Sequence, residues 1–561
     1  MALADQLRKV LRGEVDDSQA ARDACSRDAS LFRVEPEVVV RPKDADDVAA
    51  AVRFVTRARQ DPKTHMSLTA RSAGTDMSGG PLTDSVVLDM TAHLNRLIEL
   101  GRDYAVVEPG MYFRDFDKET KKRELELPSY TASRELNTVG GMAANNSGGE
   151  KNLKFGKTAR WVQELEVVLA DGQKHVLKNL EGDELRAKLT EDSFEGSLYR
   201  SVSTLVSLPA HQKIIEAHKP KVEKNSSGYA LWDIGDGRER LNLARLMVGA
   251  QGTLGIITRI RYGLVHPQPY SAMTIIFLNS LAELGPIVPQ ILQHHPDSFE
   301  SYDNHTLALA VKYFPEFAAQ MKAGVISLGI SFLPELGMLV TGGLPKIILM
   351  AEFRGDSQAA ACVQATKLAE EVKRHRPHTK VRVAMSEAAA RKYWTIRRES
   401  FNLLRKKVRG KRTAPFIDDF VVPPSQLPEF LPKLEEILSH YKNLTYTVAG
   451  HVGDGNFHII PLVDPKDPTI PKTIDELSHK VYDLVLSYDG SITGEHNDGI
   501  IRTPYVEKMF GREMYALFVE VKKLFDPLNI FNPGKKVGGN FGDAMAKLDL
   551  PNLAAKKEQQ K

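Results

Sequence analysis

The chain has 561 residues, which at about 150 residues per domain implies three or four domains or two large ones. Hydrophobic residues make up 42% and charged residues 26%, which is ordinary for a soluble protein and excludes a disordered or collagen-like chain. Lys and Arg number 75 against 72 Asp and Glu, so the net charge of +3 is too balanced to indicate a nucleic-acid-binding surface.

Cysteine usage and hydrophobic segments restrict the chemistry further. The two cysteines, Cys25 and Cys362, cannot form a disulfide scaffold, a Cys₄ zinc site or an iron–sulfur cluster, so redox chemistry would need another cofactor. Met1–Val15 lacks the apolar core of a signal peptide. Prolines and charged residues interrupt the most apolar stretch, Gly324–Met350. This pattern favours a buried element with loops, and a membrane- or partner-facing patch is the alternative. We expect a cytoplasmic protein and leave open a peripheral contact with the inner face of the membrane.

The first elements along the chain predict a small parallel α/β unit. Val38–Val40 reads as a strand, and Asp44–Gln60 as a helix with Asp44 at its N-cap and valines at helical spacing. Met66–Ala70 and Val86–Met90 are further strand candidates. Strand, helix and strand in this order favour parallel pairing.

A β-rich segment and a break follow. Trp161–Ala170 alternates as a strand does and ends at the turn pair Asp171–Gly172. Leu246–Tyr262 carries glycines between apolar residues, and His266–Pro269 then interrupts the pattern, so we place a domain boundary there.

The second half mixes strands and helices and ends in a polar tail, Phe541–Lys561, that we expect to fray. The predicted strands are Met273–Leu278, Ile347–Phe353, Tyr446–Ala449 and Phe457–Val463, and the predicted helices are Gln358–His375, Thr473–Tyr488 and Pro504–Phe525.

Three glycine-rich segments follow strands: Arg71–Gly80, Thr138–Gly149 and Gly249–Gly255. Glycine permits positive φ and close backbone approach, so exposed amides can surround a phosphate, and three such loops suit a large anionic cofactor. Each loop taken alone also reads as a plain turn. No strand is followed by G-x-G-x-x-G, and Gly156–Thr158 lacks the first glycine of a P-loop because Lys151 stands there, which argues against Rossmann and NTPase sites.

These loops resemble the FAD-contacting segments of the vanillyl-alcohol-oxidase or p-cresol-methylhydroxylase (PCMH)-type flavoproteins. The similar segments are RSAGTDMSGG, VEPG, LPSYTASRELNTVGGMAANNSGG and GAQGTLGIIT, and the resemblance runs from Pro36 to Gly539. It implies a two-part FAD-binding domain with non-covalently bound FAD. The implied FAD contacts are Ser72, Ala73, Gly74, Thr75, Asp76, Ser78, Pro109, Gly110, Ser133, Thr138, Gly141, Asn145, Ser147, Gly148, Ile256 and Asn532.

A second group of residues suits a metal ion. His451 and His458 (HVGDGNFH) flank a tight Gly453–Gly455 connection between two apolar runs, and GEHNDG offers Glu495 beside His496. Two imidazoles and a carboxylate form an N₂O ligand set with further positions open. Structural histidines are the alternative interpretation.

The same motifs resemble the D-2-hydroxyacid dehydrogenase branch of the family, which includes dehydrogenases for D-lactate and D-2-hydroxyglutarate. The resemblance implies that His451, His458 and Glu495 bind a divalent ion (Zn, Mn or Fe) and that His496 acts as the base. Asn497–Asp498 replaces the glycine of many relatives and looks like a subgroup whose larger members carry an iron–sulfur module.

One arginine is a candidate for binding the substrate carboxylate. Arg397, in YWTIRRE, resembles the arginine of the family's tryptophan–x–x–arginine element. Arg398 is the competitor, and a solvated basic helix face is the alternative. Some relatives place a lysine for a distal carboxylate where Ile417 stands, so the resemblance favours a smaller acid such as lactate over 2-hydroxyglutarate.

Together these inferences predict an α+β protein of two main domains. Residues 1–35 form a helical extension, 36–266 the PCMH-type FAD domain, 267–540 an α+β substrate domain whose last segment returns to the FAD, and 541–561 the tail. The expected activity is oxidation of a D-2-hydroxy acid with electrons passed to a separate iron–sulfur subunit, an electron-transfer flavoprotein or a quinone. A flavin oxidase, an alkyl transferase on the same fold and a non-catalytic flavin-carrying subunit are the alternatives.

Overall fold

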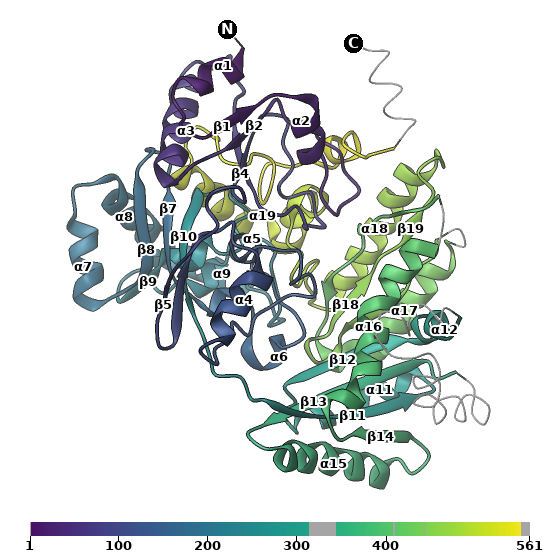
Figure 1. Cartoon of the computed structure of the whole chain (residues 1–561). Coiled ribbons are helices and arrows are strands. Elements are labelled where there is room, and N and C mark those ends of the chain that lie inside the picture. Colours follow the sequence, from purple (N-terminus) through teal and green to yellow (C-terminus); the bar gives the residue numbers. More distant parts are fainter. Residues whose placement is uncertain (1, 313–343, 408–409, 442–443, 551–561) are drawn as a thin grey trace.

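Two α+β domains, side by side, make up the described part of the chain (Figure 1). The structure is a computed structural model that describes residues 2–312, 344–407, 410–441 and 444–550. A four-stranded and a six-stranded sheet form the N-terminal domain, and a seven-stranded sheet forms the C-terminal domain. The predicted α+β class, with its two-part N-terminal domain, is confirmed.

The four-stranded sheet contains the predicted parallel unit. Its strands are β1 (Glu14–Asp16), β2 (Val38–Arg41), β4 (Val86–Asp89) and β3 (Leu68–Arg71), in that order. β4 pairs in parallel with β2 and with β3, and helix α3 (Ala45–Ala58) connects β2 to β3. The carboxylate of Asp44 caps this helix by accepting the N–H groups of Asp46 and Asp47.

The N-terminal extension joins this sheet. Between α1 (Leu3–Arg8) and α2 (Gln19–Cys25) the chain forms β1, which pairs antiparallel with β2. Leu3 and Leu7 are buried in the same core as α3. The segment predicted as a helical extension therefore holds two helices and also supplies an edge strand to the sheet.

The six-stranded sheet is antiparallel throughout, in the order β5–β6–β10–β7–β8–β9. Its strands are β5 (Leu97–Leu100), β6 (Tyr104–Val107), β7 (Val162–Val168), β8 (Lys174–Glu181), β9 (Arg240–Asn242) and β10 (Ile256–Gly263). The helices of this domain are α4 (Phe113–Lys121), α5 (Val139–Asn145), α6 (Asn152–Phe155), α7 (Gly182–Thr190), α8 (Phe194–Ser207), α9 (Pro209–His218) and α10 (Leu243–Met247). The predicted strand Trp161–Ala170 is confirmed as β7, and Gly172 turns the chain into β8 at φ +70°.

The seven-stranded sheet has the order β14–β11–β13–β12–β17–β18–β16. The strands are β11 (Tyr270–Leu278), β12 (Ser298–Asp303), β13 (Ile347–Gly355), β14 (Lys380–Ala384), β16 (Phe420–Val421), β17 (Val448–His451) and β18 (Asn456–Ile459). The helices are α11 (Leu284–Leu292), α12 (Asn304–Lys312), α15 (Gln358–His375), α16 (Glu387–Lys407), α17 (Leu427–Ser439) and α18 (Ile470–Ser487). Of the apolar segment 324–350, only residues 344–350 are described, and residues 347–350 begin β13.

Each face of this sheet packs against its own helices. Along β13, Leu349 and Ala351 lie in one core with residues of α11, α15, α17 and α18. Ile348 and Met350, which alternate with them, lie in another core with Tyr393 and Trp394 of α16. Helix α16 therefore covers the face from which the even-numbered residues of β13 project.

Strands β17 and β18 form the predicted tight hairpin. Ala449 pairs with His458 and His451 pairs with Asn456, so both histidines project from the same face. The predicted strand Phe457–Val463 is divided: β18 ends at Ile459, and β19 (Leu462–Val463) pairs with β15 (Arg412–Thr413). Pro461 lies between the two strands and has no N–H to continue the ladder.

The end of the chain returns to the N-terminal domain, as the yellow segment of Figure 1 shows. Helix α19 (Gly499–Phe525) contributes Phe510 and Phe518 to that domain's core and is kinked at Gly511, where φ is +73°. The expected fraying at Phe541 is wrong for the part up to residue 550, because α20 (Phe541–Met545) is followed by a bridge between Leu548 and Phe32.

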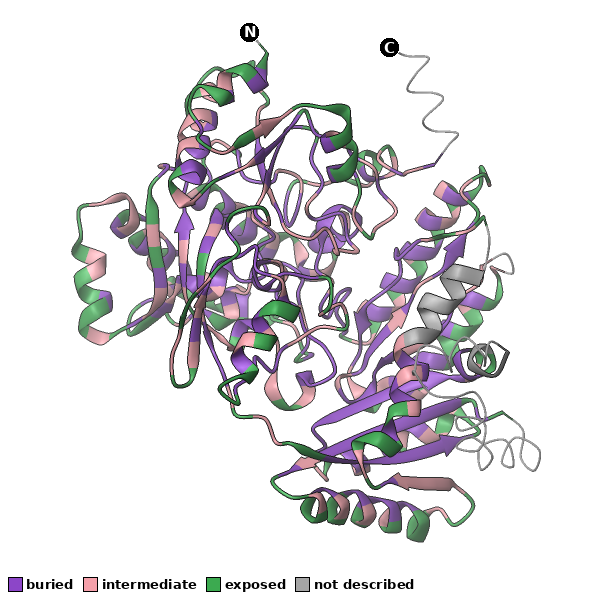
Figure 2. Cartoon of the chain, viewed as in Figure 1, coloured by how far each residue is buried: buried purple, intermediate pink, exposed green. Residues whose placement is uncertain are grey.

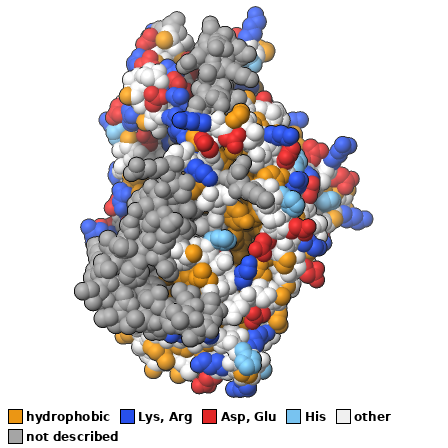
Figure 3. Space-filling view, turned by 90° about the vertical axis from the view of Figure 1, so that its right-hand side faces the viewer, with side chains coloured by type: hydrophobic (Ala, Val, Ile, Leu, Met, Phe, Trp, Pro, Cys, Tyr) orange, Lys and Arg blue, Asp and Glu red, His pale blue; other side chains and the backbone are white. Residues whose placement is uncertain are grey.

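Burial and surface charge agree with this architecture. The strands at the centre of the sheets are buried, and exposed residues gather on outer helices such as α7 and α15 (Figure 2). Among the coloured side chains of Figure 3, basic and acidic groups are interspersed. In the described part of the chain no helix has the length and apolar content needed to cross a membrane.

A charged cluster on β8 gives a testable stability prediction. His175 lies 2.9 Å from Asp171 and 3.1 Å from Glu195. Burial lowers the pKa of His175, but the two carboxylates outweigh it and raise the pKa to about 9. The cluster therefore stabilises the fold fully below the unfolded pKa of about 6.5, and this contribution is lost as the pH rises through 9.

His175→Gln should cost about 2 kcal/mol of unfolding free energy at pH 6 and much less at pH 10, measured by denaturant unfolding. His93→Gln, which breaks an exposed pair with Glu14, is the control, and an equal loss at both pH values would contradict the prediction.

Candidate active site

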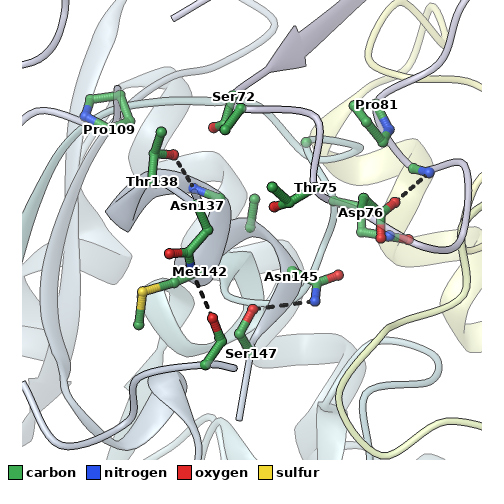
Figure 4. Close-up of a pocket in the computed structure, with 18 of the residues that line it drawn as sticks. Ser72, Thr75, Asp76, Pro81, Pro109, Asn137, Thr138, Met142, Asn145 and Ser147 are labelled. Atoms are coloured by element: carbon green, nitrogen blue, oxygen red, sulfur yellow. Dashed lines mark hydrogen bonds between the residues drawn. The ribbon is translucent and has the colours of Figure 1, made fainter. Parts of the chain in front are cut away.

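A cavity of about 260 Å³ lies among the glycine-rich loops (Figure 4). Ser72, Thr75 and Asp76 border it on one loop, and Thr138 and Asn145 border it at either end of α5. The predicted residues that line it are Ser72, Ala73, Gly74, Thr75, Asp76, Pro109, Ser133, Thr138, Gly141, Asn145, Ser147 and Gly148. The three loops, distant in sequence, thus enclose a single space.

Four predicted contacts lie behind the cavity wall. The Ser78 hydroxyl donates to Asp76, and the Asn532 amide donates to the carbonyl oxygens of Gly80 and Gln251. A side chain at Gly110 would meet the Met90 carbonyl oxygen at 2.0 Å, and Ile256 is fully buried. These four residues fix the loops, and their direct contact with a cofactor stays a prediction.

Two charged residues extend the cavity wall toward the C-terminal domain. Glu495 and His496 line the cavity together with the glycine loops. Gly148 is close to them, since a Cβ atom built there would lie 3.0 Å from Glu495 Oε2. The Asn145 amide donates to the backbone carbonyl of Glu495 at 2.7 Å, which ties the loop to this end of the cavity.

Three imidazoles converge on one oxygen of Glu495. The Nε2 atoms of His458, His451 and His496 lie 3.2, 3.4 and 3.8 Å from Glu495 Oε1. The His458 ring stacks on His496 and packs edge-on against His451. The structure therefore brings together all four residues that the sequence predicts for a metal centre and its base.

Carboxylates hold the far side of each imidazole. Asp418 faces Nδ1 of His458 at 3.2 Å and Nδ1 of His496 at 2.7 Å, and Glu300 faces Nδ1 of His451 at 2.6 Å. This arrangement is the usual support of metal-binding histidines, because it directs Nε2 toward the ligand position.

Charge dominates the titration of this cluster. Burial lowers the pKa of His458, but hydrogen bonds to Asp418 and Glu495 outweigh it and raise the pKa to about 10. The pKa of His496 is also raised, since Asp419 and Asp418 outweigh its burial. Burial raises the pKa of Asp418, but His496 and His458 outweigh it and hold that pKa well below its usual range. The carboxylates around these two imidazoles therefore favour their protonated forms.

Asp419 also lies at the centre but serves another role. Its ligand oxygen and those of His458, Glu495 and His496 lie within 4.8 Å of one another. Asp419 Oδ2 already accepts the hydroxyl of Thr493 and the backbone N–H groups of Glu495 and His496. The residue adopts a positive φ of +68°, and this strained backbone positions the carboxylate as a scaffold for the Glu495–His496 loop.

Comparisons with known proteins agree with this geometry. Residues 36–178 match the family described as FAD binding domain, and residues 268–536 match FAD linked oxidases, C-terminal domain. The chain belongs to the FAD-linked oxidase family. The glycine-rich loops Arg71–Gly80 and Thr138–Gly149 lie in the FAD-binding match, and the seven-stranded sheet lies in the C-terminal match.

Relatives and solved structures support the assignment. The chain is 28% identical to a D-2-hydroxyglutarate dehydrogenase of Pseudomonas putida over 93% of its own length and 50% of the relative, so it spans about half of that protein. It is 26% identical to glycolate oxidase subunit GlcD of Bacillus subtilis, covering 93% of both chains, and 26% identical to a D-lactate dehydrogenase of Archaeoglobus fulgidus, covering 89% and 91%. A solved p-cresol methylhydroxylase matches 96% of both chains at a TM-score of 0.66 and 16% identity, which establishes the fold.

The cavity of this chain fits a flavin dinucleotide. Gly74 has a φ of +67°, which frees its backbone to turn inside the loop, and a side chain at Gly140 would meet the Pro109 carbonyl oxygen at 2.5 Å. Gly141 leaves only ordinary contacts with Ser72, so the backbone is open to a close ligand. The side chains of Ser72, Thr75 and Ser147, which line the cavity, add hydroxyl donors for a pyrophosphate.

The two candidate arginines have carboxylate partners. Arg397 Nη2 lies 2.5 Å from Glu300 Oε2, so it backs the carboxylate that holds His451. Arg398 forms a two-pronged pair with Glu150, with Nε 2.6 Å from Oε1 and Nη2 also bonded to Oε2. A solvated basic face is excluded for these two side chains, and their contact with a substrate stays a prediction.

Sequence reasoning missed Lys224, which lies outside the recognised motifs. Its side chain is 0% exposed, and its ammonium lies 2.8 Å from Glu495 Oε2. Lys224, His451 and His458 together outweigh burial and keep the pKa of Glu495 well below its usual range. Sequence reasoning also missed Asp418 and Glu300. Asp418 stands in PFIDDFVVP, where two adjacent acidic residues within an apolar run could have indicated a buried functional carboxylate.

Replacing Lys224 should destabilise the protein strongly. Lys224→Met removes one partner of a buried pair and leaves Oε2 of Glu495 without its ammonium group, which costs about 3–5 kcal/mol of unfolding free energy. The double variant Lys224→Met/Glu495→Leu should recover part of this loss, because neither charge is then buried. Lys221→Met, which breaks an exposed pair with Asp489, should cost under about 1 kcal/mol. Denaturant unfolding measures all three, and equal losses for Lys224→Met and Lys221→Met would refute the interpretation.

Proposed function

We propose that this chain is an FAD-dependent dehydrogenase that oxidises a D-2-hydroxy acid to the 2-oxo acid. One observation carries the proposal: the Nε2 atoms of three histidines converge on a carboxylate at the edge of the glycine-lined cavity. The relatives named D-2-hydroxyglutarate and D-lactate dehydrogenase support the same reaction class.

The reaction removes the hydroxyl proton and the hydrogen on C2. FAD supplies the acceptor for the hydride from C2. We assign the proton to His496, because this imidazole lines the cavity, while its Nδ1 is bound by Asp418 and its Nε2 lies 3.8 Å from Glu495 Oε1. Asp418 stabilises the imidazolium that forms when His496 takes up the proton.

We propose that His451, His458 and Glu495 hold a divalent ion, either Zn, Mn or Fe. The Nε2 atoms of His451 and His458 already lie within 3.4 Å of Glu495 Oε1, and Glu300 and Asp418 accept hydrogen bonds from the far sides of the two rings. Such an ion would act as a Lewis acid toward the substrate hydroxyl and would lower the pKa of His496 by repelling its proton. Asp419 is left out of the ligand set because its Oδ2 already accepts three hydrogen bonds.

The proposed substrate is a small D-2-hydroxy acid of the D-lactate type. Arg397, beside Glu300, would orient the C1 carboxylate through its guanidinium group. Ile417 is fully buried and offers no charge for a second carboxylate. We expect non-covalent FAD and an external electron acceptor, for which a separate iron–sulfur subunit, an electron-transfer flavoprotein and a quinone are the candidates.

Anaerobic flavin reduction tests the proposal directly. D-lactate should bleach the oxidised flavin of the purified protein, and L-lactate should not. Removal of divalent ions with a chelator should slow bleaching at least about tenfold, and Zn²⁺ or Mn²⁺ should restore it. The absorbance of the flavin is the readout, and stopped-flow reoxidation by O₂ or a quinone separates dehydrogenase from oxidase. Absence of bleaching by every 2-hydroxy acid tested would reject the proposed function.

The role of His496 gives a separate prediction. His496→Asn should lower the rate of flavin reduction by about 10²–10⁴-fold, because no other imidazole lines the described cavity to accept the proton. FAD content should stay at the wild-type level. His479→Asn, on the exposed side of α18, is the control and should reduce its flavin normally. Unchanged kinetics in His496→Asn would remove this histidine from the mechanism.

A further inference from the structure

A buried carboxylate at the junction of the domains is bound by one guanidinium group. The side chain of Glu150 is 6% exposed and forms the two-pronged pair with Arg398 of α16. Burial raises the pKa of Glu150, but Arg398, Arg397 and Arg134 outweigh it and hold the pKa at about 2. Glu150 is therefore a permanent negative charge at neutral pH.

Chain neighbours of this carboxylate line the cavity. Glu150 lies two residues after Gly148, which borders the cavity next to Glu495. Arg134 follows the loop residue Ser133, which lines the same cavity. Arg397, the neighbour of Arg398, reaches Glu300 behind His451. The Glu150–Arg398 pair thus adjoins both the cavity loops and the arginine assigned to the C1 carboxylate.

The pair has a consequence for acids with a second carboxylate. A planar guanidinium binds a carboxylate through two parallel hydrogen bonds, and Glu150 already occupies the Nε and Nη2 edge of Arg398. A second substrate carboxylate placed there would face the charge of Glu150 at close range, and the two like charges would repel each other. Removing the carboxylate of Glu150 would release this edge of Arg398.

We propose that Glu150 is a specificity-determining residue that selects monocarboxylate over dicarboxylate 2-hydroxy acids, because it occupies Arg398 as a second substrate carboxylate would. This inference rests on the proposed function for the reaction but concerns the charge class of the substrate. The proposed preference for a monocarboxylate differs from the substrate in the name of the relatives, which are called D-2-hydroxyglutarate dehydrogenases. The alternative is that Glu150 and Arg398 only tether the two domains.

A second carboxylate pair across the same domain junction provides a matched control. Lys154 of α6 lies 2.5 Å from Asp297 of the C-terminal domain, and the Asp297 side chain is also 6% exposed. Asp297→Asn therefore breaks a tether of similar burial without changing the charge near Arg397 and Arg398. A merely structural role for Glu150 predicts the same result for Glu150→Gln and Asp297→Asn.

The test compares flavin reduction by D-lactate and D-2-hydroxyglutarate in the FAD-loaded wild type, Glu150→Gln and Asp297→Asn. We expect the wild type to prefer D-lactate, and Glu150→Gln to raise the kcat/KM ratio of D-2-hydroxyglutarate to D-lactate about tenfold. Asp297→Asn should leave this ratio unchanged. An unchanged ratio in Glu150→Gln, or a wild type that prefers D-2-hydroxyglutarate, would overturn the inference.

A binding measurement keeps the inference separate from the proposed reaction. Propionate and glutarate carry one and two carboxylates and cannot react, and their binding is followed by the absorbance change of the oxidised flavin. The wild type should bind propionate more tightly than glutarate, and Glu150→Gln should reduce or reverse this difference. If no acid reduces the flavin, the proposed function fails while this titration still decides the role of Glu150. Should Glu150→Gln fail to fold, equal binding of the two acids by the wild type would still refute the inference.

Discussion

The site depends on the compensation of one buried carboxylate, that of Glu495. Lys224 faces one of its oxygens, and the imidazoles of His451, His458 and His496 face the other. A carboxylate in a dry interior is tolerated only when it is paired and hydrogen-bonded, so this single charge requires every one of its neighbours to be in place. The further carboxylates Asp418 and Glu300 then balance the imidazoles in turn. The outcome is a closed network of opposite charges around Glu495.

This network also joins the two domains. Asn145 of the glycine loop binds the backbone of Glu495, and Asn497 donates to the carbonyl oxygens of Asn145 and Gly249. Asp498 accepts from Ser227 and faces Lys536 at 2.8 Å. The Asn497–Asp498 pair therefore attaches the loop that carries the candidate base to the walls of the FAD cavity.

Local patterns in the sequence predicted the parts of the site that lie on contiguous motifs. The hairpin that carries His451 and His458 follows from two apolar runs and a glycine turn, and α3 follows from its N-cap and its valine spacing. Lys224 could not be predicted, because nothing in its own segment indicates that it meets a glutamate 271 positions later in the chain. The partner of Arg397 was equally hidden: a basic run on a helix reads as solvated until tertiary packing places Glu300 beside it. The tail was misread because its docking site, residues 31–33, lies at the other end of the chain.

The return of α19 makes the N-terminal domain discontinuous in sequence. Its core contains Phe510 and Phe518 next to residues of the six-stranded sheet, and β3 receives a hydrogen bond partner at Ile530. During synthesis on the ribosome, the first 260 residues therefore emerge without the helix that completes their core. This domain must wait for the whole of its neighbour to be translated, so the long-range closure of the chain, rather than local helix formation, is expected to limit how fast the flavin-binding half matures.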